Sequence, residues 1–467
     1  MRLLLLLSLL FPFAAPVNAQ EFKEYEMALN NAMKEARITS AGIVIIKNGK
    51  EVYKCPLGYL NAGRTKKTNS STLYNVASVS KSLTAWGVMK LVEQEKIELN
   101  EPVNKYLKRW KVPDYSDGTP ITIKMLLSHT AGLNMGAVPD YAPGKSLPSL
   151  PDAVKDLMVI QKPGEGFRYS GGGYMLLQLL IEDVTGTEFS TYMKETVLAP
   201  LGMMNSSFQI PVHSDNVATP YDETLKAAPH YSYVGVSAAG LYTCLDDLSK
   251  FAIASLGVQP NPVLKKETLD LMKEKVTKNY GLGYSFDGPD SSIEFLGHGG
   301  AASGWRAAYY INTSGDGIVL LSNSSFNDFV NLGLCIWIKS AYHRDSRYCT
   351  KSDYTFLIID LFTKGQKYTA KRIKMLQGES KENIFPEFIC NTLGYWLMRL
   401  ERTEGAKTFF EFNTRLYPNS ANVYDSMGEF YETTGNNKKA LKYYRKVLEL
   451  DPNNNHALHA IQIIGRK

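Results

Sequence analysis

The end of the chain repeats its own pattern with a period of 34 residues. Glycine, alanine, aromatic and proline positions all recur at this offset: Gly394 with Gly428, Ala406 with Ala440, Phe409 and Phe410 with Tyr443 and Tyr444, Leu416 with Leu450, and Pro418 with Pro452. A fixed period of this length indicates a helical array in which each unit buries its apolar face only against its neighbours. Residues 350–467 are therefore expected to fold as paired helices.

The residue types at the repeating positions resemble the tetratricopeptide signature. Small glycine and alanine side chains let paired helices approach closely, and each proline ends the second helix of a unit. Two clear units are fewer than the three that such arrays usually need. We therefore expect residues 353–376 to add a degenerate unit. We also expect the tail to pack against the preceding domain and to offer a surface to a protein partner; a generic helical tail with chance matches is the alternative.

Residues 20–345 carry a mixed pattern of strands and helices. A hairpin is expected at residues 42–53, because Asn48-Gly49 suits a type I′ turn. Helical periodicity marks residues 78–94, 174–184, 190–198 and 245–255, and strand signals mark residues 280–286, 306–311 and 318–322. A hairpin first, helices in the middle and antiparallel strands last indicate an α+β sandwich of an antiparallel sheet and a helical subdomain.

Composition and charge exclude several classes of protein. Hydrophobic residues make up 44% of the chain and charged residues 21%, as in ordinary globular proteins. Lys plus Arg is 52 and Asp plus Glu is 46, so the net charge is only +6, and a nucleic-acid partner is not expected. The five cysteines are scattered without a Cys-x-x-Cys pair, which argues against a metal or redox motif: Cys55, Cys244, Cys335, Cys349 and Cys390.

The first residues have the parts of a secretory signal peptide. Met1-Arg2 precedes an uncharged apolar run over residues 3–17, and Val17-Asn18-Ala19 is a small-residue cleavage pattern. The run is shorter than the roughly 20 apolar residues of a membrane span, so an uncleaved anchor is the weaker alternative. The sequence therefore predicts cleavage after about Ala19 and a periplasmic or secreted protein without an integral membrane segment.

The first chemical motif is Ser78-Val79-Ser80-Lys81. On a helix, residues i and i+3 share a face, so Lys81 can lie beside the Ser78 hydroxyl and take part in moving its proton. Ser78 is expected near the helix N-terminus, where free N–H groups favour developing negative charge. A serine hydroxyl needs such an activating base, and a lysine serves only where its surroundings lower its proton affinity. Alone, the motif also fits an exposed helix face.

Two further motifs follow in order. The Gly-rich stretch 163–174 places Tyr169 before a predicted helix, where its phenol could relay a proton to or from Ser78. The stretch 297–301 combines His298 with Gly299 and Gly300, whose missing side chains would let a substrate backbone approach as an added strand. A packed loop tyrosine and a turn histidine are the structural alternatives.

These three motifs, in this order, resemble the serine β-lactamase and penicillin-binding protein superfamily, most closely its class C β-lactamase, esterase and D-peptidase branch. The segments Leu126-Leu-Ser-His-Thr-Ala-Gly-Leu133, Pro200-Leu-Gly-Met203 and 239–251 strengthen the likeness, which spans about residues 25–340. We interpret the first two of these segments as framework.

The resemblance implies a role for each matching position. Ser78 matches the acylated nucleophile, Lys81 the lysine that shares its proton, and Tyr169 the general base for attack and acid for the leaving group. His298 falls where the third motif of the family carries Lys or His, and with Gly299 and Gly300 it is assigned to substrate binding. The backbone N–H groups of Ser78 and Ala301 match the oxyanion hole. No metal or cofactor is implied.

The sequence departs from the family pattern at two positions. The second motif is usually Tyr-x-Asn, but here Gly171 replaces the asparagine, whose amide contacts substrate and lysine. Ser170 is a candidate to replace part of that amide. His298 stands where a lysine is common and gives a less assured positive charge. Both changes weaken the case for efficient cleavage of carboxylate-bearing β-lactams.

Two functions remain open at this point. The first is an exported serine hydrolase that acts through an acyl-enzyme on an ester, an amide or a D-amino-acid peptide. The second is a catalytically weak penicillin-binding-type sensor or scaffold that uses the repeats for partner binding. The missing asparagine and the tail favour the second, whereas the joint presence of Ser78, Lys81, Tyr169 and His298 favours the first.

Overall fold

The computed structural model describes residues 19–290, 293–343, 387–399 and 401–465, with isolated positions between 360 and 375. The predicted signal peptide and most of the predicted degenerate unit at 353–376 lie outside these residues. The chain forms two compact units, Met1–Thr350 and Lys351–Lys467.

A six-stranded antiparallel sheet forms the centre of the first unit, in the order β2-β1-β10-β9-β8-β7. The first and last thirds of the unit thus share one sheet, because β1 pairs with β10. The predicted hairpin is confirmed: Asn48 and Gly49 have φ of +50° and +70° between β1 and β2. The strands are β1 (Ser40–Lys47), β2 (Lys50–Gly58), β7 (Ser285–Asp290), β8 (Ile293–Ala302), β9 (Trp305–Ile311) and β10 (Gly317–Ser322).

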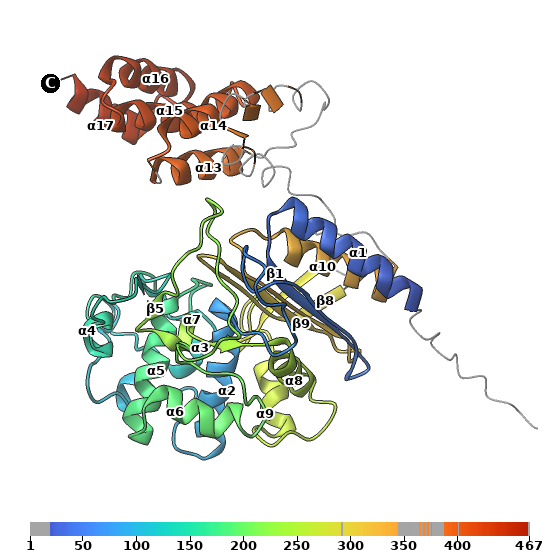
Figure 1. Ribbon diagram of the computed structural model, residues 1–467. Helices are drawn as coiled ribbons and strands as arrows, with labels where there is room; N and C mark the ends of the chain where they lie inside the picture. The colour runs from blue at the N-terminus through green and yellow to red at the C-terminus, as the bar shows by residue number, and fades with distance from the viewer. Residues whose placement is uncertain are drawn as a thin grey trace, which may run out of the picture. The chain divides into compact units, whose positions relative to one another are not determined.

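Helices cover both faces of this sheet (Figure 1). On one face Leu320 of β10 contacts Gly333 of α10 (Asp328–Tyr342), which also packs against α1 (Ala19–Glu35). The next residue, Leu321, pairs with Gly42, which lies against Leu245 of α8 (Leu245–Leu256) on the other face. Consecutive residues of a strand point to opposite faces, so this sheet is buried on both.

The helical part of the unit is inserted between β2 and β7. Its longer helices confirm the predicted positions, and Gly186 ends α5 in the left-handed conformation with φ +70°. Its elements are β3 (Tyr74–Asn75), α2 (Ser80–Glu93), α3 (Ile123–Leu127), β4 (Asp140–Tyr141), α4 (Leu150–Val154), α5 (Gly171–Thr185), α6 (Phe189–Met193), β5 (Ser232–Tyr233), α7 (Val236–Ala239), β6 (Tyr242–Thr243) and α9 (Lys266–Met272).

Helix α2 lies at the centre of this part and is buried on almost every side. The sequence predicts one apolar face, but polar residues on the other faces are buried as well. They find partners in neighbouring segments: the Ser82 hydroxyl donates to the Gly283 carbonyl at 2.7 Å, and the Thr84 hydroxyl donates to the Ser237 carbonyl at 2.8 Å. Hydrogen bonds of this kind allow a polar residue to stay in the core.

The strand predicted at residues 280–286 is mostly wrong, because β7 begins only at Ser285. The preceding residues turn back onto α2 and α3, where the Gly283 N–H donates to the Leu127 carbonyl. Gly283 has φ +82°, and a Cβ there would lie 2.3 Å from the Ala85 Cβ. Strand β8 gave no strand signal in the sequence, because its glycines 297, 299 and 300 weaken strand propensity.

The second unit confirms the repeat. Gly394 lies against the Phe410 ring, and 34 residues later Gly428 lies against the Tyr444 ring in the same way. A Cβ at either glycine would approach the ring to within 2.5 Å, so the glycines set the spacing of each helix pair. The described helices are α13 (Glu387–Arg399), α14 (Thr403–Leu416), α15 (Ala421–Thr433), α16 (Asn437–Leu450) and α17 (Asn455–Ile464).

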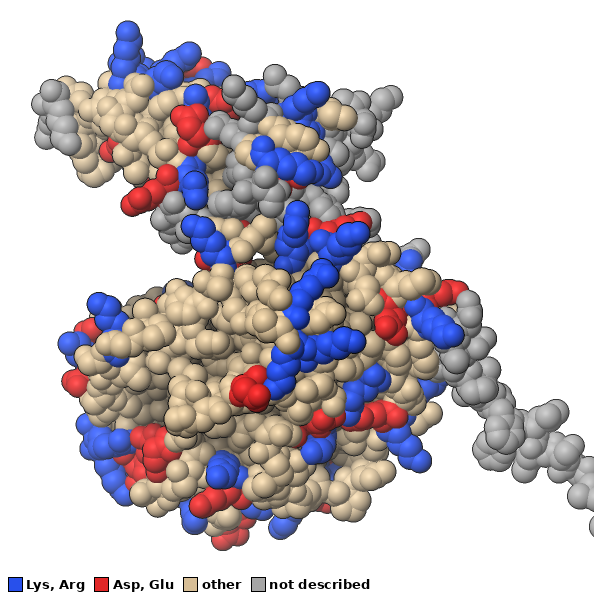
Figure 2. All heavy atoms as spheres, in the orientation of Figure 1, with Lys and Arg blue, Asp and Glu red and all other residues tan. Residues whose placement is uncertain are grey.

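The surface carries charged side chains of both signs. Basic and acidic side chains alternate over much of the face in Figure 2, without a large acidic field. None of the described helices is long and apolar enough to cross a membrane.

Cys55, Cys244 and Cys390 are free and buried, whereas Cys335 is disulfide-bonded.

We expect Gly283→Ala to destabilise the first unit by about 1–3 kcal/mol beyond the cost of its left-handed backbone, because the added methyl group would overpack against Ala85. Gly118 is a matched control: it has φ +80° but nothing within 4 Å of its Cβ position, so Gly118→Ala should cost only about 1–2 kcal/mol. Urea unfolding of both variants measures this difference. Equal destabilisation would contradict the close packing of Gly283 on α2.

Candidate active site

Ser78 lies in a 3-10 turn, η1 (Ala77–Val79), that leads directly into α2. The turn is entered through Ala77, whose φ of +44° is unusual for a residue with a side chain. The Asn75 side chain holds this conformation by accepting the Ala77 N–H at 2.9 Å. Ser78 therefore stands at a sharp bend at the start of the central helix, as the sequence predicts.

Lys81 is one turn further along and is almost completely buried, with 2% of its surface exposed. Its Nζ is 3.1 Å from Ser78 Oγ and donates to the Ala238 carbonyl at 2.8 Å. The same nitrogen lies over the ring of Tyr169, 4.9 Å from its centroid. The structure thus brings together the serine, the lysine and the tyrosine predicted from the sequence.

Burial without a counter-ion controls the protonation of Lys81. In the described part of the chain Lys81 forms no ion pair, and burial lowers the pKa of its ammonium to about 7. An ordinary lysine would be almost fully charged at neutral pH, but this lowered pKa makes the uncharged amine of Lys81 accessible at neutral pH. An uncharged amine next to Ser78 Oγ can accept the serine proton.

The Tyr169 phenol is hydrogen-bonded to the Ser78 side chain, and burial raises its pKa to about 12. At neutral pH this phenol therefore keeps its proton. Of the two groups beside Ser78, Lys81 is thus the better proton acceptor, and Tyr169 is the better proton donor.

Both ring nitrogens of His298 are engaged inside the protein. Nδ1 is 2.6 Å from the Gly299 carbonyl, which can only accept, so Nδ1 carries the proton. Nε2 then accepts the Tyr280 hydroxyl at 3.0 Å. Burial, with the charge on Lys81, lowers the pKa of His298 to about 3, so this histidine is uncharged at neutral pH.

Strand β8 brings the third motif against Ser78. A Cβ at Gly300 would lie 2.1 Å from the Val76 carbonyl oxygen and 3.5 Å from the Ser78 nitrogen, so only glycine permits this approach. The neighbouring strand β7 pairs with β8 up to Gly297, and the described residues place no strand beside 298–302 on that side. The backbone N–H groups of Ser78 and Ala301 remain the predicted oxyanion donors.

The space of the missing asparagine is filled by protein. A Cβ at Gly171 would lie 2.9 Å from Val138 and 3.0 Å from the Gly136 carbonyl, so a side chain there would displace this loop. The Ser170 hydroxyl accepts the Gly173 N–H at 3.0 Å and donates to the Met135 carbonyl at 2.7 Å. Ser170 thus caps α5 and is already occupied, so it does not stand in for the lost amide.

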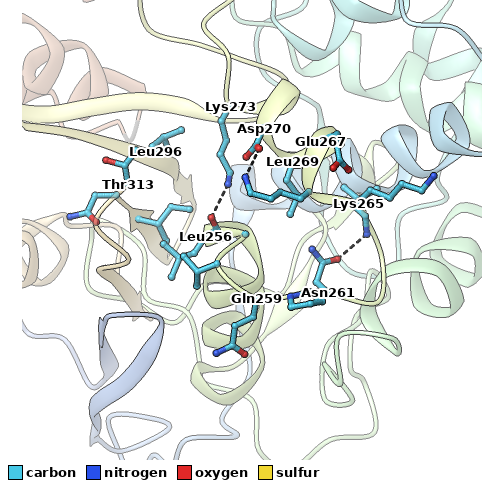
Figure 3. A pocket seen from close by; sticks show the side chains of 17 residues that line it. Leu256, Gln259, Asn261, Lys265, Glu267, Leu269, Asp270, Lys273, Leu296 and Thr313 are labelled. Carbon is cyan, nitrogen blue, oxygen red and sulfur yellow. Dashed lines mark hydrogen bonds and ion pairs between the residues drawn. The ribbon is translucent and has the colours of Figure 1, made fainter.

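The candidate residues other than Lys81 line a cavity of about 520 Å³. Aromatic, aliphatic and uncharged polar side chains form its walls: Ser78, Phe167, Tyr169, Asn279, Tyr280, Ser285, Phe286, His298, Gly299, Gly300, Ala301, Ala307, Ala308, Tyr310, Asn327, Val330, Asn331 and Leu334. A larger hollow of about 840 Å³ is lined by the end of α8, the loop that follows it, α9 and residues at β8 and β9 (Figure 3), but none of the candidate residues reaches it.

Sequence reasoning missed three contributors to this site. Ala238 holds Lys81 through its carbonyl, Tyr280 holds His298, and the His129 ring packs at a tilt of 38° against the Tyr169 ring, with ring centroids 4.3 Å apart. His129 belongs to the segment 126–133, which we interpreted as framework. Ala238 makes its contact through a backbone carbonyl, so no residue type in the sequence indicates it. The histidine at position 129, in contrast, is a residue type that could have indicated a role at the site.

A possible metal-binding group lies elsewhere. In the described residues, Asp425, Glu429 and His456 of the second unit bring three ligand-type atoms within 4.8 Å of one another. His456 Nδ1 is hydrogen-bonded to Asp425 at 2.9 Å, so these groups already satisfy one another. None of the candidate active-site residues belongs to this group.

Comparison with known proteins agrees with this site. The Beta-lactamase family matches residues 26–333, and the Tetratricopeptide repeat family matches residues 421–454, which contain α15 and α16. The chain is 27% identical over 319 residues to Protein flp of Staphylococcus aureus (strain N315), which covers 64% of this chain and 63% of that protein. The chain thus matches less than two thirds of the length of that relative.

Two solved structures share the fold of the first unit. One is the octameric penicillin-binding protein homologue from Pyrococcus abyssi, with a TM-score of 0.58 and 26% identity over 68% of this chain and 76% of the other. The other is EstCE1, a hydrolase with promiscuous acyltransferase activity, with a TM-score of 0.56 and 21% identity over 69% of this chain and 99% of the other. The likeness to EstCE1 shows the fold alone.

We expect Ser78→Ala to abolish covalent labelling by a fluorescent fluorophosphonate, because this probe reacts with an activated serine hydroxyl. The control is Ser71→Ala, on the loop before β3 and outside the cavity, which should label like the unaltered protein. Gel fluorescence measures labelling, and thermal unfolding checks that both variants are folded. An adduct on Ser78→Ala at the original rate would show that another residue is the nucleophile.

Proposed function

The chain belongs to the beta-lactamase family of serine hydrolases, and we propose that it hydrolyses uncharged esters, or amides and D-amino-acid peptides without a nearby carboxylate, through an acyl-enzyme on Ser78. The observation that carries this proposal is that, in the part of the chain that the structure describes, no charged side chain lines the cavity in front of Ser78, whereas Lys81 lies outside this lining. None of the cavity-lining residues is Arg, Lys, Asp or Glu, and His298 is uncharged at neutral pH. A substrate carboxylate would lose its water there without gaining a cation.

The proton movements follow from the two pKa shifts. Ser78 Oγ attacks the substrate carbonyl while Lys81, whose lowered pKa makes its uncharged amine accessible at neutral pH, accepts the serine proton. Tyr169 still holds its proton and donates it to the leaving oxygen or nitrogen as the bond to the acyl carbon breaks. Water then attacks the acyl-enzyme, and the same groups act in reverse.

The oxyanion that forms on attack needs donors that are already in place. We assign this role to the backbone N–H groups of Ser78 and Ala301, supported by the contact of Gly300 with the Ser78 backbone. One such donor is worth about 3–4 kcal/mol of barrier in other acyl-transfer enzymes. His298 contributes by fixing the conformation of 298–299 rather than by donating to substrate, since its single N–H is already used.

We expect kcat/KM for a simple ester to exceed that for the β-lactam nitrocefin by at least about tenfold, a difference of roughly 1.4 kcal/mol. The reason is the cavity lining, which offers no cationic side chain to the nitrocefin carboxylate. Parallel assays with p-nitrophenyl butyrate and nitrocefin measure the ratio. Faster turnover of nitrocefin would contradict the proposal, and a stable penicillin adduct without turnover of either substrate would favour the sensor alternative.

We propose that the second unit binds a protein partner rather than substrate. Its aromatic residues serve the helix packing: Phe410 and Tyr444 fill the spaces left by Gly394 and Gly428. A chain ending at Thr350, the boundary between the units, should therefore keep ester hydrolysis within a few-fold of the full chain. If this shorter protein is folded by circular dichroism but inactive, the tail shapes the active site and the assignment fails.

We also propose that the protein is exported to the periplasm or secreted. The pattern of residues 1–19 supports export. The disulfide bond of Cys335 is consistent with it, because such bonds persist mainly in oxidising compartments.

A further inference from the structure

His129 is hydrogen-bonded to both neighbours of Tyr169. Its carbonyl accepts the Arg168 N–H at 2.8 Å, and its ring Nδ1 accepts the Ser170 N–H at 3.0 Å. One residue thus holds the backbone on either side of the tyrosine, from a segment 40 positions earlier in the chain (169 − 129). Any movement of His129 would move the base of the Tyr169 side chain.

The ring of His129 also fixes the Tyr169 side chain itself. It packs against the phenol ring with a centroid distance of 4.3 Å and an interplanar angle of 38°. The other side chains around it are Phe167, Tyr174 and Tyr280, whose ring centroids lie between 4.7 and 5.8 Å away. Burial, followed by the electrostatic effects of Lys81 and His298, holds the pKa of His129 well below its usual range.

This arrangement fixes the tautomer of His129. Because Nδ1 accepts a hydrogen bond and the ring is uncharged, Nε2 carries the proton. Nε2 is buried and has no hydrogen-bond partner among the residues that the structure describes. A buried donor without an acceptor is destabilising.

His129 carries a second cost in its backbone. Its φ is +59°, in the left-handed region that residues with side chains seldom occupy. Strained backbone of this kind is destabilising and is found mainly at functional sites. A residue needed only to fill the core would not require an acceptor nitrogen, an orphaned N–H and a left-handed backbone at the same place.

We propose that His129 is a positioning residue for the reaction: through the Ser170 N–H and the ring contact it holds the Tyr169 phenol where this group donates its proton to the leaving group. The proposal rests on the acyl-enzyme function proposed above. It assigns a role in the chemistry to the segment 126–133, which the sequence presents as framework.

The test compares two esters with the same acyl group. p-Nitrophenolate leaves without a proton, whereas the ethoxide of ethyl butyrate must be protonated as it leaves. A variant that misplaces Tyr169 should lose kcat/KM on ethyl butyrate by at least about tenfold more than on p-nitrophenyl butyrate, a selective loss of roughly 1.4 kcal/mol. A merely structural role would lower both by the same factor.

Two substitutions separate the hydrogen bond from the ring contact. His129→Phe keeps an aromatic ring but leaves the Ser170 N–H without its acceptor. It should therefore lose kcat/KM selectively on ethyl butyrate, as Tyr169→Phe should. His129→Asn keeps an oxygen acceptor near the Nδ1 position and tolerates φ +59°, so the ratio of the two kcat/KM values should stay within about threefold of the unaltered protein. Thermal unfolding shows whether each variant is folded.

The outcomes distinguish this proposal from the underlying function. His129 does not position the tyrosine if folded His129→Phe keeps the original ratio of the two kcat/KM values. The same conclusion follows if folded His129→Asn loses kcat/KM on ethyl butyrate as selectively as Tyr169→Phe does. His129→Asn decides the matter if His129→Phe does not fold. If the unaltered protein hydrolyses neither ester, the proposed function itself fails.

Discussion

The site depends on one lysine that is buried without a carboxylate. Lys81 is held by the Ala238 carbonyl, by Ser78 Oγ and by the faces of two tyrosine rings, none of which carries a negative charge at neutral pH. Burial therefore favours the free amine, which is the form that can activate Ser78. Excluding water from such a group requires a helix that is buried on all sides. Helix α2 meets this requirement, because its polar residues Ser82 and Thr84 find hydrogen-bond partners in the 280–284 segment and in α7.

The same requirement explains how distant parts of the chain meet. The nucleophile follows the first hairpin, the tyrosine precedes α5, and the third motif lies on β8, between β7 and β9 of the sheet that the hairpin begins. Gly283 and Gly300 let the returning chain approach α2 and η1 closely. In the resulting site, Lys81 contacts Ser78 from outside the cavity lining, and the side chains that line the cavity are uncharged. The group that activates Ser78 is thus separate from the residues that contact substrate.

Much of this arrangement could be predicted from the sequence, and the rest could not for physical reasons. Ser78, Lys81 and Tyr169 were expected together, and the small residues of the repeat were expected to let paired helices approach closely, as Gly394 does against Phe410. The contact of Lys81 with Ala238 is made by a backbone carbonyl and is invisible in residue types. The strand predictions failed at two glycine-containing segments. Residues 280–284 were predicted as a strand but precede β7, and the glycine-rich β8 is a strand that the sequence did not indicate. Gly171 was recognised as a departure, but only the structure reveals that Gly136 and Val138 fill the space.

The most direct test of this account is the pKa of Lys81 itself. NMR titration of protein carrying lysine labelled with carbon-13 at the ε position follows each ammonium group, and the resonance missing from Lys81→Met identifies the one of interest. The account predicts that this resonance titrates near pH 7, with the amine uncharged above that pH. Titration near the ordinary lysine value of about 10.4 would show a charged Lys81 at neutral pH and would contradict its role as the base for Ser78.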